Sequence, residues 1–247
     1  MRIGSVDAEM DQMIDQEQIR EGILRARDRI ADAARKAGRR SEEINLIGIS
    51  KTQPADAIRA AYEAGLRHFG ENRVQEWEGK RAALVDLQAT WHLVGHLQSN
   101  KAARAAGLFH SVDSLDDFTL AQRLERARDG QSEARKLRVL LEVRVEEEES
   151  KSGVKVQEAA ALAEKVVALS HLELAGLMCI PPFLEDAERV RPYFRRLREL
   201  RDSLARKIGR ELPVLSMGMS HDFEVAIEEG ATEVRVGTAI FGTRTAK

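Results

Sequence analysis

Short apolar runs alternate with polar, helix-patterned segments along most of the chain. Eight runs are expected to be strands: Ile44–Ser50, Arg67–Gly70, Trp91–Gly95, Phe109–Val112, Arg138–Val145, Leu172–Ile180, Val214–Ser216 and Glu233–Val236. Every run except the last is followed by a segment whose apolar residues recur at helical spacing, for example Ala55–Ala64, Asp116–Arg128 and Glu158–Leu169. Alternation of strands and helices is typical of an α/β protein with a parallel sheet.

The length of the repeating unit favours a closed barrel. The 204 residues from Ile44 to the end form eight units of about 25 residues, which is sufficient for a (β/α)8 TIM barrel. A doubly wound open sheet is the competing architecture, and alternation alone does not distinguish the two. Because no GxGxxG motif follows the first run, the usual dinucleotide-binding reason to prefer the open sheet is absent.

The segment before the first strand is expected to contain an extra N-terminal helix. Residues 1–15 are polar and acidic without a core pattern, and we expect a flexible polar leader there. From Gln16 to Lys36 apolar residues recur at helical spacing, and Gly38 is a suitable stop signal. With no linker or low-complexity tract in the sequence, residues 16–247 are predicted to form a single domain.

Composition excludes several classes of protein. Hydrophobic residues make up 43% of the chain, enough for a sizeable core, and 39 basic against 41 acidic residues leave a net charge of −2. This balance is unlike that of a general binder of nucleic acid or anionic membranes. The single cysteine, Cys179, forms no intramolecular disulfide and is expected to be a buried structural thiol. With no signal peptide and no apolar run long enough to span a bilayer, we expect a cytoplasmic protein without membrane contact.

The carboxyl ends of barrel strands are where functional groups are expected. The first run reads Ile47-Gly48-Ile49-Ser50-Lys51, and the two-residue period of a strand puts Ile47, Ile49 and Lys51 on one face. If that face points inward, Lys51 stands at the barrel mouth as an amine nucleophile that can form a Schiff base with a carbonyl. A strand-end lysine that extends into solvent is the alternative.

Two segments with small residues follow the seventh and eighth runs. They are Ser216-Met217-Gly218-Met219-Ser220 and Gly237-Thr238, and Ser220 is a suitable N-cap for a helix beginning near His221. Barrels commonly bind phosphate at the loops after these two strands, where backbone amides approach an anion closely. Ordinary turn chemistry is the alternative for each segment.

Arg235 alternates with Val234 and Val236 in the last run and shares a face with Glu233 and Gly237. An arginine inside a barrel needs a partner, whereas an outward one would pair with a helix glutamate. A lysine for an aldehyde, a phosphate site and a cation between them together match pyridoxal phosphate. An arginine facing the pyridine nitrogen leaves that nitrogen unprotonated, which predicts limited chemistry at the Cα of an amino acid.

The remaining candidates are weaker. His92 and His96 lie on a strand and a loop rather than on one helix face, so no metal site is predicted. Glu146–Glu149 reads as a solvated loop, and Lys151 is expected to be solvated, with a second amine over the barrel mouth as the alternative. Asp222 and Glu224 suit the first turn of a helix because of its dipole.

Seven segments resemble the pyridoxal phosphate homeostasis proteins of the YggS/PROSC type. They are GISKTQP (48–54), RHFGENRVQE (67–76), WHLVGHLQSNK (91–101), SKSGV (150–154), GLMCIPPF (176–183), SMGMSHDFEVAI (216–227) and VRVGTAIFGTR (234–244). The resemblance implies a fold type III barrel that binds pyridoxal phosphate, similar to the N-terminal domain of alanine racemase.

The resemblance also implies roles for individual residues. Lys51 matches the Schiff-base lysine, and Arg235 the residue that faces the ring nitrogen. Ser216, Met217, Gly237 and Thr238 match the phosphate-binding segments. Asn72 and His92 match strand-end positions that line the cofactor pocket; the alternatives are a helix N-cap for Asn72 and a satisfied core histidine for His92.

The function expected from these residues is to hold and deliver the cofactor with little or no turnover, with PLP-dependent apoenzymes as possible recipients and a monomeric state. Racemases of the related fold take a second base from an additional β-domain, and no length for one follows the last run. A racemase or other PLP enzyme is the first alternative. A class I aldolase-like barrel using Lys51 is the second, although Arg235 has no obvious partner in a sugar phosphate.

Overall fold

Eight parallel strands close into a ring in the computed structural model, which describes residues 4–129, 135–146 and 152–242. The strands are β1 (Asn45–Ile49), β2 (His68–Glu71), β3 (Thr90–Leu93), β4 (Ser111–Leu115), β5 (Leu137–Arg144), β7 (Leu172–Met178), β8 (Val214–Met219) and β9 (Glu233–Val236). They pair in the order β4-β3-β2-β1-β9-β8-β7-β5, and pairing of β4 with β5 closes the ring. The predicted closed barrel and its eight strands are confirmed; the short β6 (Val154–Lys155), which pairs with the end of β5, was not predicted.

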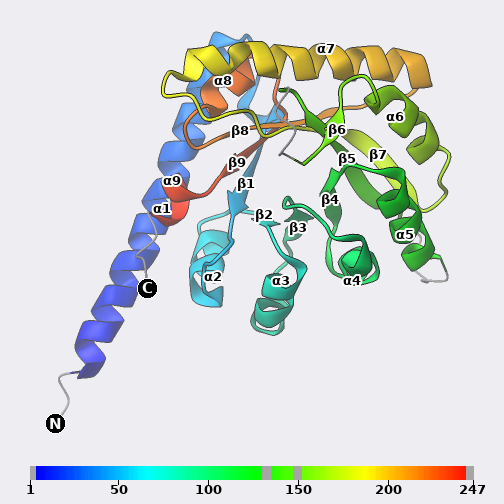
Figure 1. The fold of residues 1–247 in the computed structure, drawn as a ribbon. Coiled ribbons are helices and arrows are strands. Elements are labelled where there is room, and N and C mark those ends of the chain that lie inside the picture. The colour runs from blue at the N-terminus through cyan, green and yellow to red at the C-terminus, as the bar shows by residue number, and fades with distance from the viewer. Residues whose placement is uncertain (1–3, 130–134, 147–151, 243–247) are drawn as a thin grey trace.

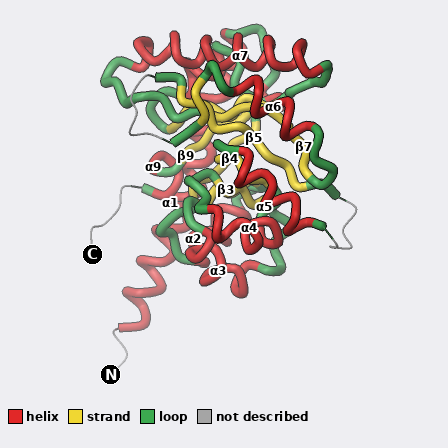
Figure 2. Tube along the Cα trace, turned by 45° about the vertical axis from the view of Figure 1, so that its right-hand side comes forward, coloured by secondary structure: helices red, strands yellow, loops and turns green. Residues whose placement is uncertain are grey.

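Helices surround the ring (Figures 1 and 2). The helices that follow the strands are α2 (Ala55–Glu63), α3 (Val74–Arg81), α4 (Ala102–Leu108), α5 (Phe118–Arg128), α6 (Ala159–Val167), α7 (Arg191–Ile208), α8 (Phe223–Glu228) and α9 (Thr238–Phe241). Single 3-10 turns lie at Ser41–Glu43, Ala82–Leu84, Ser99–Lys101 and Ala187–Val190. The last strand is therefore followed by a helical turn, α9, which the sequence pattern did not predict.

Helix α1 (Gly4–Lys36) precedes the barrel. From Ile19 onward it buries one apolar face, and it packs against α2, α8 and α9. The helix predicted from Gln16 begins earlier, at Gly4, so the backbone of residues 4–15, which were expected to form a flexible polar leader, is helical. The sequence allows this, because Val6, Met10, Met13 and Ile14 recur at helical spacing and the segment contains no proline that would stop a helix. Figure 1 shows this first part of α1 projecting away from the barrel.

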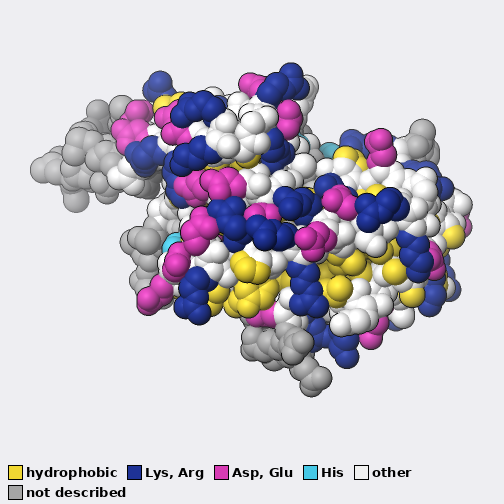
Figure 3. Space-filling view, turned by 90° about the horizontal axis from the view of Figure 1, so that it is seen from above, with side chains coloured by type: hydrophobic (Ala, Val, Ile, Leu, Met, Phe, Trp, Pro, Cys, Tyr) yellow, Lys and Arg dark blue, Asp and Glu magenta, His cyan; other side chains and the backbone are white. Residues whose placement is uncertain are grey.

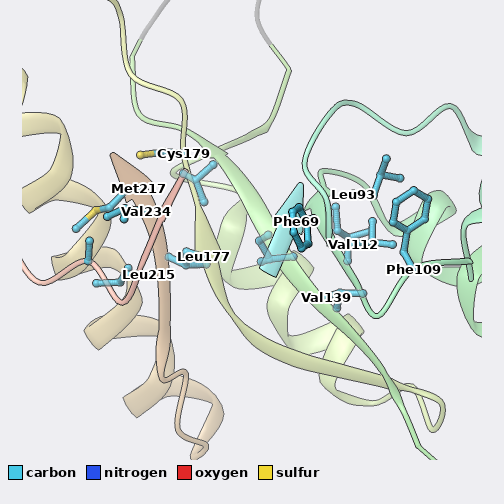
Figure 4. Packing of buried hydrophobic residues seen from close by; sticks show 14 of the residues in the cluster. Phe69, Leu93, Phe109, Val112, Val139, Leu177, Cys179, Leu215, Met217 and Val234 are labelled. Atoms are coloured by element: carbon cyan, nitrogen blue, oxygen red, sulfur yellow. The ribbon is translucent and has the colours of Figure 1, made fainter. Parts of the chain in front are cut away.

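The main hydrophobic core lies between the strands and the helices around them. Phe69, Leu93, Val112 and Val139 point outward from successive strands into this core, as do Leu177, Leu215 and Val234 further round the ring (Figure 4). The alternate residues point into the barrel, where a Cβ at Gly70 would meet Ile47 and Ile49. Burial on both faces explains why the strands read as short, nearly continuous apolar runs.

Helix α7 carries an arginine-rich face that is paired with acidic side chains. Glu229, only 4% exposed, lies within ion-pair distance of Arg191, Arg195 and Arg198. Figure 3 shows basic and acidic side chains interspersed on this side of the molecule. The three arginines on this face therefore form ion pairs with one nearly buried carboxylate. Separately, the described helices include none with the length and apolar character needed to cross a bilayer.

Candidate cofactor site

A cavity of about 560 Å³ opens at the carboxyl ends of the strands. Its lining comes from segments far apart in the sequence: Lys51 after β1, Asn72 after β2, Glu142 on β5, Arg235 on β9, and Gly237 directly after β9. This is the end of a (β/α)8 barrel where functional groups gather. Five of the residues that the sequence singled out therefore line one cavity, namely Lys51, Asn72, Arg235, Gly237 and Thr238.

Lys51 is half-buried and follows β1 with the same parity as Ile47 and Ile49. The side chains of Ile47 and Ile49 lie inside the barrel, which places the lysine on the inward face at the mouth. A turn closes directly beneath it, because the backbone N–H of Gln53 donates to the carbonyl oxygen of Ser50 at 3.1 Å.

Arg235 points into the barrel with only 3% of its surface exposed. Its guanidinium donates to Ser216 Oγ at 2.8 Å and to the carbonyl oxygen of Cys179 at 2.7 Å. Two neutral acceptors fix the orientation of this group at the cavity without cancelling its charge. The guanidinium can therefore present a fixed cation and hydrogen-bond donor to a ligand. The outward arginine paired with a helix glutamate is not what the structure shows.

Ser216 and Met217, expected in a phosphate-binding segment, are not among the described residues that line the cavity. Strand β8 continues to Met219, beyond the predicted end at Ser216, and its pairing with β9 shifts register between Ser216 and Met219. Met217 points into the outer core (Figure 4), and Ser216 is fully buried as an acceptor for Arg235. The cavity is lined instead by the residues after the irregularity, Met219 to Asp222.

Gly218 makes this irregularity possible. Its φ of +92° is in the region that favours glycine, and a Cβ there would lie 2.6 Å from Ala226 and 2.8 Å from Phe223. The N-cap position of the next helix, α8, is Asp222, which makes no side-chain capping bond to the helix. Its carboxylate accepts instead from the backbone N–H of Met219 at 2.6 Å. Ser220 is therefore not the N-cap; its hydroxyl accepts from the backbone N–H of Gly237 at 3.3 Å.

Asn72 reaches the cavity because two loops approach each other closely. A Cβ at Gly95, after β3, would lie 2.3 Å from the carbonyl oxygen of Asn72 and 2.8 Å from its Cα. Only a residue without a side chain allows this contact. The expected alternative for Asn72, the N-cap of α3, falls on Arg73 instead.

His92 is also placed differently from the expectation. It lies one inward position below Val94, is fully buried and is absent from the described cavity lining. Its Nδ1 is 3.0 Å from Asp113 Oδ2 and its Nε2 is 3.1 Å from His68 Nδ1. The alternative interpretation, a core histidine with satisfied nitrogens, describes it correctly. Strand β3 ends at Leu93, so the residues that face the mouth are Val94, Gly95 and His96.

A buried polar layer surrounds His92 inside the barrel. Ligand atoms of His92, Asp113 and Glu233 lie within 4.8 Å of one another, a spacing at which a metal could bind. Glu233, however, already accepts from Arg138 at 2.6 Å. Although burial alone would raise the pKa of Asp113, the neighbouring His92 lowers it below its usual value. We interpret the layer as ion pairs and hydrogen bonds that compensate one another in the barrel interior.

Glu142 is a cavity residue that the sequence analysis missed. It is 6% exposed, and its Oε2 finds no hydrogen-bond partner among the described residues. Burial, together with the nearby carboxylate of Asp116, raises the pKa of Glu142 to about 7, although Arg235 acts in the opposite direction. A signal was present, because an acidic residue within the apolar run Arg138–Val145 has the same parity as Leu140, which points inward.

This raised pKa predicts a pH-dependent penalty on folding. The folded protein holds the Glu142 proton up to about pH 7, whereas an ordinary glutamate loses it near 4.5. Stability is therefore lost as the pH rises between these values, by an amount on the order of 1–3 kcal/mol. We expect Glu142→Gln to raise the melting temperature at pH 8 and to change it little at pH 4.5. Melting curves at both pH values, with the exposed Glu211→Gln as control, test this; equal effects at both pH values would contradict it.

Other predicted features are also located. Cys179 is fully buried, and burial raises the pKa of its thiol to about 12, as suits a structural residue. His96 pairs with Asp116 at 3.3 Å, whereas His92 contacts a different carboxylate, that of Asp113. Glu224, in the first turn of α8, pairs with Arg29 of α1 at 2.5 Å. Lys151 and residues 147–149 of the expected solvated loop lie outside the described residues.

The fold and the lysine-bearing mouth define a barrel of the alanine racemase N-terminal class, and the family model for the alanine racemase N-terminal domain matches residues 26–245. A pyridoxal phosphate homeostasis protein of Aquifex aeolicus is 48% identical over 91% of this chain and 97% of its own length. One from Escherichia coli K12 is 42% identical over 92% of this chain and 97% of its own. This chain belongs to the pyridoxal phosphate homeostasis protein family.

Solved structures agree with this placement. The structure of PipY from Synechococcus elongatus with PLP bound superimposes with a TM-score of 0.77 at 39% identity, covering 86% of this chain and all of PipY. Alanine racemase from Corynebacterium glutamicum superimposes with a TM-score of 0.70 at 19% identity, over 93% of this chain and 62% of the racemase. The second similarity concerns the fold alone.

Proposed function

We propose that this protein binds pyridoxal 5′-phosphate at the barrel mouth through Lys51 and serves to hold and deliver it. The single observation that carries the proposal is the meeting of Lys51, Arg235 and the Gly237-Thr238 segment in one cavity of about 560 Å³. Membership in the homeostasis family and the PLP-bound PipY structure support the same ligand.

The donor set fits this cofactor. When bound, pyridoxal phosphate supplies an aldehyde that condenses with a primary amine to a Schiff base, releasing one water. Lys51 is the described lysine that lines the cavity, and it supplies the amine. Arg235 supplies a fixed hydrogen-bond donor for the ring nitrogen. Because a guanidinium donates hydrogen bonds and accepts none, the ring nitrogen must be the acceptor and stays unprotonated.

The phosphate is assigned to the segment after β9. Among the described residues, the backbone N–H of Gly237 donates only to the Ser220 hydroxyl, at a long 3.3 Å, and the exposed Thr238 lies beside it on the cavity wall. A Cβ at Gly237 would lie 3.5 Å from Ile49 Cβ, an ordinary contact. The fold therefore tolerates alanine at this position, while the added methyl group occupies space that the phosphate needs.

This assignment predicts a selective loss of affinity. The double variant Gly237→Ala/Thr238→Val is expected to weaken PLP binding by about tenfold or more, equivalent to about 1.4 kcal/mol. Pyridoxal, which lacks the phosphate, should bind nearly as it does to the wild type. Absorbance titrations with both ligands measure the two affinities. Equal losses for PLP and pyridoxal would contradict the phosphate assignment.

Holding the cofactor with little turnover is the mode of action that we favour. A racemase needs a second base at the cofactor, and a tyrosine does not supply one in this cavity. Neither Tyr62 in α2 nor Tyr193 in α7 is among the described residues that line it. The fixed cation at Arg235 also works against a protonated ring, which a broad range of chemistry at Cα requires. Release to PLP-dependent apoenzymes, a monomeric state and a place in the cytoplasm belong to the same proposal.

Hydrogen exchange separates the carrier from the racemase alternative. The holoprotein is incubated with alanine in deuterium oxide, and incorporation at Cα is followed by NMR. A carrier should exchange no faster than free PLP at the same concentration. Exchange well above that background would establish an enzyme and overturn the carrier proposal, while leaving the PLP site itself intact.

A further inference from the structure

We propose that Lys80, Glu76 and Glu71 are positioning residues that clamp the turn carrying Lys51 and so set the amine in place for the aldehyde. The inference rests on the proposed function of the cavity. None of the three residues is among the described residues that line the cavity. They come from the end of β2 and from α3, on the segment that follows the neighbouring strand.

The clamp holds the residues on both sides of Lys51. Lys80 Nζ donates to the carbonyl oxygen of Ser50 at 2.9 Å, and the Ser50 hydroxyl donates to Glu71 Oε1 at 2.7 Å. On the other side of Lys51, the backbone N–H of Thr52 donates to Glu76 Oε1. The peptide units that flank the lysine are therefore fixed by side chains from another part of the chain.

The three clamp residues are also bound to one another. Lys80 Nζ lies 2.7 Å from Glu76 Oε1 and 3.1 Å from Glu71 Oε1. The side chain of Glu71 is fully buried and that of Lys80 is 13% exposed, so the ion pair between them has little contact with water. One ammonium group thus connects both carboxylates with the Ser50 carbonyl, and its three donors are all used.

The backbone at Thr52 indicates why a clamp is needed. Thr52 has a φ of +65°, and it is the one residue other than glycine with a positive φ in the described part of the chain. It occupies the third position of the turn Ser50–Gln53, where a positive φ favours glycine, and a β-branched residue adopts it rarely. Such a conformation persists only where its surroundings hold it, and these are often functional sites. Lys51 occupies the adjacent position of the same turn.

A purely structural role for Lys80 would have a different signature. It would reduce binding of every ligand at the mouth, because the cavity as a whole would change. A positioning role reduces only binding that uses the Lys51 amine. Pyridoxamine 5′-phosphate separates the two, because it keeps the ring and the phosphate of PLP but has an amine in place of the aldehyde and forms no bond to Lys51.

The experiment measures dissociation constants of PLP and of pyridoxamine 5′-phosphate for the wild type and for Lys80→Met. We expect PLP to bind about tenfold or more weakly to the variant, while pyridoxamine 5′-phosphate changes by less than about threefold. Arg59→Met is the matched control, because it breaks a surface ion pair with Asp86 at 2.7 Å and should alter neither constant. Lys80→Arg should restore part of the PLP affinity.

Glu76→Ala keeps the test decisive if Lys80→Met does not fold, because it leaves the buried Lys80–Glu71 pair intact. It should show the same selective loss for PLP, of smaller size. Equal losses for both ligands in these variants, or unchanged PLP affinity, would overturn the positioning role. Failure of the wild type to form any adduct with PLP would overturn the proposed function instead.

Discussion

Lys51→Ala is expected to abolish the imine absorbance band and the borohydride-reducible adduct with PLP. The reason is that Lys51 is the lysine of the described cavity lining, so no other described amine faces the same space. Binding should persist through Arg235 and the Gly237-Thr238 segment, but at an affinity lower by about tenfold or more. Absorbance titration, followed by borohydride reduction and intact mass, measures both effects.

The control for this variant is Lys207→Ala, which removes a surface lysine paired with Glu164 on the outer helices. It should leave the band, the adduct and the affinity unchanged. A full yield of reduced adduct on another lysine of Lys51→Ala would show that the assignment is wrong.

Gly176→Ala is expected to have the largest effect on stability. Gly176 lies in β7 between β5 and β8, and a Cβ there would be 1.9 Å from the carbonyl oxygen of Val214 and 2.7 Å from its carbonyl carbon. Both atoms belong to backbone, so relief requires the strands to separate. We expect a loss of at least about 3 kcal/mol of unfolding free energy, or failure to fold.

Gly79→Ala is the matched control for the same exchange of residue types. Gly79 lies within α3, and a Cβ there would meet nothing within 4 Å. Because alanine is the better helix former, this variant should gain about 0.5–1 kcal/mol. Urea unfolding of both variants measures the difference. A Gly176→Ala protein as stable as the wild type would mean that β7 and β8 are packed differently from this description.

Much of the architecture could be predicted because the two relevant periods are local properties of the sequence. The period of two grouped Lys51 with Ile47 and Ile49 in β1 and left open whether Lys51 and Arg235 point inward; in the structure both line the cavity. The start of α1 was missed although Val6, Met10, Met13 and Ile14 recur at helical spacing in its first part.

The depth of a residue inside the barrel could not be predicted in the same way. Parity shows that His92 faces inward, but whether it or Val94 reaches the mouth depends on where β3 ends against its neighbours. The register shift in β8 similarly moves Ser216 and Met217 below the mouth. Such a shift depends on how β8 pairs with β9, a strand that lies further along the chain. It is therefore set by tertiary structure and not by the local sequence.

The clamp around Lys51 illustrates a further limit. Glu76 and Lys80 are four residues apart in α3, and their pairing across one helical turn is readable from sequence. Their contacts with Ser50 and Thr52 bridge more than twenty positions, and only the folded chain brings them together. The conformation of Thr52, which makes these contacts significant, leaves no mark in the sequence.

The central claim is that Lys51 bonds covalently to pyridoxal phosphate within the barrel mouth. The most direct test is to titrate the wild-type protein with PLP while recording visible absorbance, then to reduce with borohydride and map the modified peptide by mass spectrometry. We predict a yellow imine band that saturates at one PLP per chain, and an adduct on the peptide containing Lys51. Absence of the band, or an adduct spread over surface lysines with Lys51 unmodified, would contradict the account.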